Sequence, residues 1–332
     1  MIGQETREVE RKTIAILKVL SDSQEPLGAR VIARRLGDLG IDLGERAVRY
    51  HLKLMDERGL TRAAGRRNGR SITLRGIEEA KSALVGDRIG SIVGRIELLA
   101  YRTTFDPEKR NGEVPINTAI FPKEEFARAL HIMKDVFSAG LCVSELVAVA
   151  GEGERLGEVI VPQGKVGLAT VSSITTSGAL FKAGIPVSSR FGGILQIRGY
   201  SPFRFVELIE YAGCSLDPQE IFVASKMTSV GEVARRGEGK ILANFHEFLG
   251  PSRPAVETAI AKLKEAGLGG LVIMGEMSEP VCEVPVGLNK IGMILQSGLN
   301  QVAAAVEVGV EVENHAMSGL IEYRKLVSFW NL

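Results

Sequence analysis

At 332 residues the chain is long enough for two or three domains, and its 45% apolar and 24% charged residues are typical of an ordinary folded protein. No apolar run reaches the roughly 18 to 20 residues that a membrane span needs, and the polar first residues predict no signal peptide, so we expect a cytoplasmic protein. Three cysteines spaced about 70 residues apart exclude a disulfide framework and a zinc finger, and we expect neither metal nor cofactor.

Charge is divided unevenly along the chain, although the net charge is only +1. Residues 1–75 hold 16 lysines and arginines against 10 acidic residues, which leaves 25 basic and 30 acidic residues for the remainder. A basic N-terminal part on an acidic body indicates that only the N-terminal part meets a polyanion such as nucleic acid.

The basic part begins with two predicted helices. Apolar residues at helical spacing give residues 7–20 and residues 29–36 one apolar face each. The segment 26–28, Pro-Leu-Gly, breaks the chain between them. A turn-rich segment over residues 37–44 then leads to a third helix.

The third predicted helix covers residues 45–58 and separates apolar from basic side chains. Val48, Leu52 and Met55 recur at spacings of four and three, so we expect them to pack against the first two helices, with His51 beside them in a structural role. The opposite face carries Arg46, Arg49, Tyr50 and Lys53. Long cationic donors on a third helix are what insertion into the major groove of DNA needs.

A β-hairpin is predicted next, with strands over residues 60–64 and 71–75 and a tip over residues 65–70. Four arginines gather on it without an acidic residue: Arg62, Arg66, Arg67 and Arg70. So many like charges favour a counter-anion, for which DNA phosphate is the expected partner and a solvated basic loop the alternative. Three helices followed by a basic hairpin resemble winged-helix repressors, and Arg66, Arg67 and Arg70 join the third helix as DNA-binding candidates.

The rest of the chain repeats itself. Lys165-Val-Gly matches Lys290-Ile-Gly at an offset of 125 residues, and Ser172 matches Ser297 at the same offset. Each copy is predicted to run strand, helix, strand, strand, short helix, strand. We therefore predict an α+β fold, with a winged helix-turn-helix over residues 1–75 and a linker over 76–95. A tandemly duplicated effector and dimerisation domain follows over 96–332, with copies of about 96–200 and 201–332.

Signatures of catalysis are scarce in this duplicated domain. The sequence has no G-x-S-x-G elbow, no P-loop and no H-E-x-x-H helix, so an enzyme is disfavoured. Residues 172–178, rich in Ser and Thr, leave a predicted strand and enter a helix, where hydroxyl and backbone N–H groups form an anion site. Nearby cations would neutralise a carboxylate. The candidate effector residues are Lys165, Ser172, Ser173, Thr175, Thr176 and Arg190; helix capping with surface charges is the alternative interpretation.

Four further stretches stand out across the chain. They are Asp87-Arg-Ile-Gly90 through Tyr101-Arg-Thr-Thr-Phe-Asp106, Pro162-Gln-Gly-Lys-Val-Gly-Leu-Ala-Thr170 through Gly184-Ile-Pro186, Phe191-Gly-Gly193, and Leu216-Asp-Pro218 through Ala224-Ser-Lys-Met-Thr-Ser-Val230. These stretches are more specific than the winged helix. With them, the whole chain resembles the NrpR family, the archaeal repressors of nitrogen-assimilation genes.

This resemblance implies a homodimeric repressor that binds palindromic double-stranded operator DNA and releases it when the dicarboxylate 2-oxoglutarate accumulates. Because members of the family differ in domain number, it also implies that a second effector domain, a higher assembly or a related partner chain takes part. Three alternatives stay open: a regulator that senses a different metabolite, a DNA-binding part joined to an enzyme, and a dimerisation module without a ligand.

Overall fold

The structure, a computed structural model, describes residues 2–21, 23, 25–38, 41–65, 69–82 and 90–332. It divides into two compact units, Met1–Arg88 and Ile89–Leu332. Residues of the expected linker over 76–95 take part in two helices: α4 (Leu74–Ser82) belongs to the first unit, and α6 (Ser91–Arg102) belongs to the second. Among the described residues, no helix combines the length and the apolar character that crossing a membrane requires.

The first unit has the predicted winged helix-turn-helix fold. It consists of α1 (Ile2–Ser21), α2 (Ala29–Asp38), α3 (Glu45–Glu57), β1 (Thr61–Ala63), β2 (Arg70–Ile72) and α4. The predicted apolar faces meet in its core, where Leu17 and Leu52 are almost completely buried. β1 and β2 form an antiparallel hairpin, and Leu27 forms a bridge to Arg70. Gly69 has φ +78°, and a Cβ there would lie 2.4 Å from the Leu27 backbone, so a larger residue would push the hairpin away.

The second unit is the predicted duplicated α+β domain. The first copy runs β3 (Glu113–Pro122), α7 (Lys123–Ser138), β4 (Leu146–Ala150), β7 (Lys165–Val171), α8 (Ile174–Lys182) and β8 (Val187–Arg198). The second runs β10 (Gly239–Leu249), α11 (Arg253–Glu265), β11 (Leu271–Met277), β12 (Lys290–Gln296), α12 (Asn300–Glu307) and β13 (Glu313–Glu322). Both follow the predicted order of strand, helix, strand, strand, short helix, strand.

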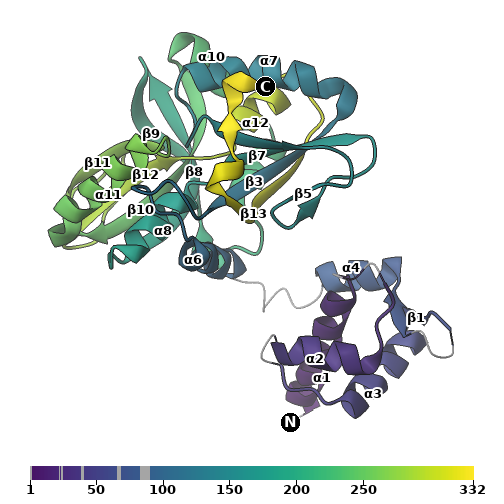
Figure 1. The fold of residues 1–332 in the computed structure, drawn as a ribbon. Coiled ribbons are helices and arrows are strands. Elements are labelled where there is room, and N and C mark those ends of the chain that lie inside the picture. The colour runs from purple at the N-terminus through teal and green to yellow at the C-terminus, as the bar shows by residue number, and fades with distance from the viewer. Residues whose placement is uncertain (1, 22, 24, 39–40, 66–68, 83–89) are drawn as a thin grey trace. The chain divides into compact units, whose positions relative to one another are not determined.

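The two copies exchange their last strands (Figure 1). The strands form two five-stranded antiparallel sheets, ordered β13-β3-β7-β4-β14 and β11-β12-β10-β8-β9. β8 of the first copy pairs with β10 of the second, and β13 of the second copy pairs with β3 of the first. Such reciprocal pairing is what two copies related by a two-fold axis make, and it joins them into one unit.

Helix packing follows the same exchange. α7 of the first copy packs against α12 of the second, and α8 of the first packs against α11 of the second. Phe121 and Met133 are fully buried together with Val302 in the first of these layers. In the second layer Leu180 is buried against Val256. Each copy therefore completes the core of the other.

The segments outside the copies bound the region between them. β9 (Ser201–Glu210) forms a hairpin with β8, and the expected boundary at residues 200/201 lies in its turn. The 3-10 turn Tyr211–Gly213, α9 (Pro218–Ala224) and α10 (Val230–Arg236) lead into the second copy. Short elements complete the unit: β5 (Arg155–Leu156), β6 (Val159–Ile160), β14 (Val327–Ser328) and the 3-10 turns Gly250–Ser252, Tyr323–Lys325 and Phe329–Asn331.

Candidate DNA-binding surface and effector cavity

α3 presents a polar face to solvent and an apolar face to the core. Val48, His51, Leu52 and Met55 are buried on the inner side. Burial, with a smaller contribution from the charge of Lys12, lowers the pKa of His51 and keeps its imidazole neutral in the core. The four predicted DNA-binding residues of the helix, Arg46, Arg49, Tyr50 and Lys53, are all exposed, and Tyr50 keeps 61% of its surface.

The ion pairs of this face are weak and replaceable. Arg49 pairs with Glu45 one helical turn away, and Lys53 lies 4.0 Å from Glu57. All four side chains are solvent-exposed, and such pairs contribute about 0–1 kcal/mol, so a phosphate can replace the carboxylate at small cost. The exposed half of α3 therefore has the cationic and hydrogen-bonding groups that a DNA groove requires.

Of the three predicted DNA-binding arginines in the hairpin, one is placed by the structure. Arg70 Nε lies 2.9 Å from a carboxylate oxygen of Asp56, whose other oxygen accepts the hydroxyl of Thr61 at 2.6 Å. This pair fixes the base of the hairpin against the end of α3. Arg66 and Arg67 lie outside the described residues.

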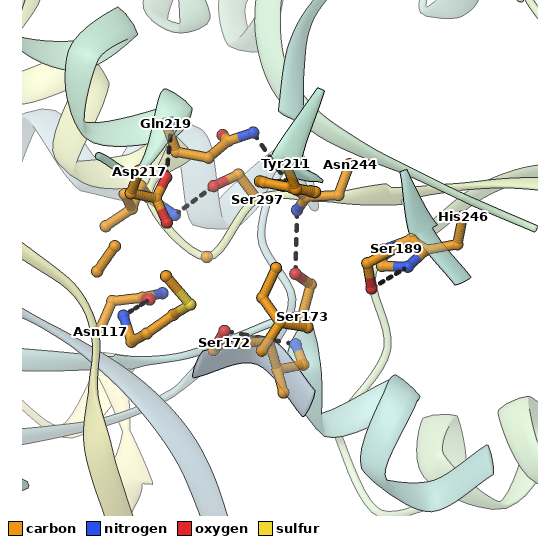
Figure 2. A pocket seen from close by; sticks show the side chains of 16 residues that line it. Asn117, Ser172, Ser173, Ser189, Tyr211, Asp217, Gln219, Asn244, His246 and Ser297 are labelled. Carbon is orange, nitrogen blue, oxygen red and sulfur yellow. Dashed lines mark hydrogen bonds between the residues drawn. The ribbon is translucent and has the colours of Figure 1, made fainter. Parts of the chain in front are cut away.

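A cavity of about 30 Å³ lies between the two copies of the second unit (Figure 2), which is room for roughly two water molecules. Both copies and the segments around them contribute to its wall. The lining residues are Ile96, Asn117, Ser172, Ser173, Ile174, Ser189, Tyr211, Asp217, Gln219, Asn244, His246, Ser297, Gly298, Leu299, Ala316 and Met317.

Two helices begin at the cavity, one from each copy. α8 follows Ser172 and Ser173, and α12 follows Ser297 and Gly298. The hydroxyl of Ser172 accepts the N–H of Ile174 at 3.4 Å, and the hydroxyl of Ser297 accepts the equivalent N–H of Leu299 at 3.1 Å. Helix N-termini carry partial positive charge, so both helix starts favour anionic groups, although the N–H groups of Ile174, Thr175 and Thr176 already donate within the first turn of α8.

A buried hydrogen-bond network around Asn244 joins the copies. Its Oδ1 accepts the Tyr211 hydroxyl at 2.6 Å and Gln219 Nε2 at 3.0 Å. Its Nδ2 donates to the Ser173 hydroxyl at 3.0 Å, at the start of α8. Asn117 occupies the corresponding strand of the first copy, and its Oδ1 accepts the N–H of Met317 at 3.0 Å. The network makes the wall of the cavity sensitive to movement of one copy against the other.

Acidic groups stand at one side of the cavity. Burial raises the pKa of Asp217 to about 6, although the N–H of Gln219 at 2.7 Å opposes the shift. Burial also raises the pKa of Glu220, which accepts the N–H of Ala316 at 2.5 Å. Within the part of the chain that the structure describes, no lysine or arginine lines the cavity. Any anion bound there is held by helix N-termini and neutral donors, and it must tolerate Asp217.

Two buried polar atoms of the lining have no hydrogen-bond partner among the described residues: His246 Nε2 and Gln219 Oε1. His246 Nδ1 meets the Ser189 hydroxyl at 3.1 Å, and burial lowers the pKa of the imidazole to about 4. Buried polar atoms without a partner are uncommon, so both are atoms that a ligand or water would satisfy. No group of three or more His, Cys, Asp or Glu suited to a metal occurs among the described residues.

The predicted effector residues do not all gather at this cavity. Ser172 and Ser173 line it, whereas Thr175 and Thr176 are buried in the first turn of α8 outside the lining. The remaining two, Lys165 and Arg190, are paired elsewhere. Lys165 begins β7, at the opposite end from Ser172, and lies 3.5 Å from Glu311.

Arg190 belongs to a separate buried ion cluster. Its guanidinium meets Glu247 at 2.7 Å, and Lys290 meets the other oxygen of the same carboxylate at 2.9 Å. Glu247 is 1% exposed, so the two cations compensate a buried charge and are not available to the cavity. The lining residues that sequence analysis missed include Asn117, Tyr211, Asp217, Gln219, Asn244 and His246. The repeat offset that relates Ser172 to Ser297 was the signal from which this site could have been located.

A winged helix with a polar recognition face, followed by a duplicated domain around a shared cavity, defines a transcription regulator with a regulatory domain. Residues 14–80 match the family model of the ribonuclease R winged-helix domain. Residues 89–328 match the model of the NrpR regulatory domains NRD1 and 2. The chain belongs to the NrpR family.

Named relatives agree with this assignment. The chain is 41% identical to the global nitrogen regulator NrpRI of Methanosarcina mazei, over 96% of this chain and 98% of that protein. It is 35% identical to the global nitrogen regulator NrpR of Methanocaldococcus jannaschii, over 96% of this chain and 55% of that protein, so it spans about half of that longer relative.

A solved structure shows the same fold. A nitrogen repressor-like protein from Methanococcus jannaschii superposes with a TM-score of 0.61 at 24% identity, covering 72% of this chain and 98% of its own.

Proposed function

We propose that this protein is a repressor of nitrogen-assimilation genes that binds operator DNA through α3 and the hairpin and releases it when 2-oxoglutarate occupies the cavity. The observation that carries the proposal is the meeting of two helix N-termini, one from each copy, at one cavity. A homodimer in the cytoplasm, reading a palindromic site with two winged helices, is the assembly that this function needs.

The chemistry of the cavity suits a dicarboxylate with a carbonyl group. Each carboxylate of the ligand can accept hydrogen bonds at one helix N-terminus, one near Ser173 and the other near Gly298. His246, if its Nε2 carries the proton, is a neutral donor for the oxo group or for a carboxylate. Apolar side chains such as Ile174 and Leu299 cover the space between these polar ends.

Ligand binding has to move the copies apart. A cavity with room for roughly two water molecules is too small for 2-oxoglutarate, so its walls must separate to admit the ligand. A groove of about 440 Å³ along α6 and α8 shares Ile96 and Ser189 with the cavity and offers the way in. Because the walls come from both copies, the opened state differs from the closed one in the relative position of the copies.

α6 connects this movement to the winged helix. Arg95 donates to the carbonyl of Met317 in the cavity wall at 2.8 and 3.1 Å. The N–H of Gly90, just before α6, donates to the carbonyl of Cys214 at 3.0 Å. α6 is the first helix after the winged-helix unit in the chain, so movement of the cavity wall reaches the connection to that unit. The ligand releases DNA only if it binds the DNA-incompetent arrangement more tightly.

The first prediction is that 2-oxoglutarate weakens operator binding. A duplex selected by the protein from a random-sequence library is titrated with the full chain, and fluorescence anisotropy reports binding with and without the ligand. We expect the apparent dissociation constant to rise by about 5- to 150-fold, the usual range of allosteric coupling. Glutarate, which lacks the oxo group, is the matched control and should have a smaller effect. Unchanged operator affinity at saturating 2-oxoglutarate would remove this ligand as the effector.

A second prediction separates the cavity from the cations that sequence analysis grouped with it. Ser173→Ala removes a hydroxyl that faces the cavity and accepts from Asn244, so we expect 2-oxoglutarate affinity to fall by about tenfold in calorimetry. Lys165→Ala, at the far end of β7, should change that affinity by less than about twofold. The opposite ranking of the two variants would place the ligand near Lys165.

A further inference from the structure

Asp217 places an acidic side chain in a cavity whose other lining groups favour anions. It is the N-cap of α9, where its Oδ1 accepts the N–H of Gln219, and it is only 8% exposed. Figure 2 shows the carboxyl group of Asp217 among the side chains that line the cavity. Ser297, just before α12, is another of these lining residues. The capping bond fixes the carboxyl group there, so Asp217 cannot turn away from a ligand without losing the hydrogen bond that caps the start of α9.

The charged and titratable groups around Asp217 do not cancel its charge. Glu220 on α9 adds a second negative charge, and Tyr211 and Cys214 are neutral on the preceding segment. Arg95 of α6 is the cation that faces it, and its guanidinium is held on the Met317 carbonyl. His246 across the cavity is neutral because its own pKa is low. A dicarboxylate in the cavity would therefore meet an ionised carboxylate without a cation between them.

We propose that 2-oxoglutarate binds together with one proton, which Asp217 takes from solvent, and that the resulting carboxylic acid donates a hydrogen bond to the ligand. This inference rests on the proposed function and names the residue that sets its specificity. The carboxylate of Asp217 gains one proton, the ligand keeps its two negative charges, and the net charge of the cavity changes by one unit instead of two. Asp217 thereby favours an anionic ligand when protonated and an ammonium-bearing one, such as glutamate, when ionised.

The environment of Asp217 makes this proton uptake easy. Burial has already moved its pKa to about 6, so it is mostly ionised near neutral pH but close to its titration range. A neighbouring carboxylate raises the pKa of an acid further, because like charges disfavour ionisation. The free acid keeps its capping oxygen for Gln219 and gains an O–H donor for the ligand.

Calorimetry of the full chain tests this inference. 2-Oxoglutarate is titrated at several pH values, in pairs of buffers with different ionisation enthalpies, so that the number of protons taken up is measured directly. We expect close to one proton for the parent protein at about pH 8 and an affinity that falls by about tenfold per pH unit there. Asp217→Asn keeps the cap and is neutral; it should take up no proton and bind more tightly than the parent at about pH 8.

The control and the contrary outcomes are distinct. Glu220→Gln keeps an oxygen for the N–H of Ala316 and should leave proton uptake unchanged. Normal 2-oxoglutarate binding without proton uptake, or weaker binding by Asp217→Asn, would overturn this inference and leave the effector assignment in place. No binding of 2-oxoglutarate by either protein at any pH would overturn the effector assignment and this inference with it.

Discussion

Replacing both Arg46 and Arg49 with alanine is expected to abolish operator recognition. Both side chains are exposed in the N-terminal half of α3, where a recognition helix meets base edges. A contact of an arginine with a base is worth about 1–3 kcal/mol, so the pair should cost about 2–6 kcal/mol, or about 30-fold to more than 10⁴-fold in affinity. Anisotropy titrations with the selected duplex and with an unrelated duplex measure the loss of affinity and the loss of discrimination.

The double variant has a clear control. Arg324→Ala removes an exposed arginine from the second unit, so it should leave operator affinity within about twofold. Circular dichroism checks the fold of both proteins, and we expect no change because neither side chain of the double variant is buried. Operator discrimination that survives the double substitution would show that α3 does not read the DNA.

The second large effect concerns Asn244. Its replacement by alanine leaves the Tyr211 hydroxyl and the Ser173 hydroxyl without their buried partner and removes one bond of Gln219. A buried polar group that loses its partner costs about 1–3 kcal/mol, so Asn244→Ala should lower the free energy of unfolding by about 3–5 kcal/mol. Urea denaturation measures the loss, and calorimetry should show that 2-oxoglutarate binding is lost with it.

Asn117 provides the matched comparison. It occupies the corresponding strand of the other copy and accepts a hydrogen bond from the Met317 N–H, so Asn117→Ala should cost about 1–3 kcal/mol. A larger loss of stability for Asn244→Ala than for Asn117→Ala would show that the network around Asn244 joins the copies. Equal costs for the two variants, or a cost below about 1 kcal/mol for Asn244→Ala, would contradict that conclusion.

Local patterns were sufficient to predict the winged helix. Val48, Leu52 and Met55 recur at helical spacing, and the structure buries all three while exposing the four polar residues opposite. The order of elements in the second unit was also predictable, because a repeat offset reveals equivalent elements whatever they pack against.

The exchange of strands was beyond the reach of local patterns. β8 pairs with β10 and β13 with β3 across long stretches of chain, and nothing in the spacing of apolar residues specifies a partner. For the same reason the sequence identified only some of the residues that line the cavity. Ser172 and Ser173 were identified from a helix start, but Asn244 and Asp217 reach them only through the fold.

The structure places the two predicted cations, Lys165 and Arg190, away from the cavity that Ser172 and Ser173 line. Lys165 and Ser172 lie at opposite ends of an extended strand, seven positions apart, which is roughly 20 Å. Arg190 lies on a strand that carries it to Glu247, a buried carboxylate that needs its charge. A cation near an anion site in the sequence is evidence for that site only when the backbone between them turns.

The coupling of ligand and DNA is the central claim, and it is tested most directly by measuring 2-oxoglutarate affinity twice by calorimetry. One titration uses the free protein, and the other uses the protein saturated with the selected operator duplex. Thermodynamic linkage requires that DNA weaken 2-oxoglutarate binding by the same factor by which 2-oxoglutarate weakens DNA binding. We predict equal factors between about 5 and 150. Equal 2-oxoglutarate affinity with and without the operator would contradict the account.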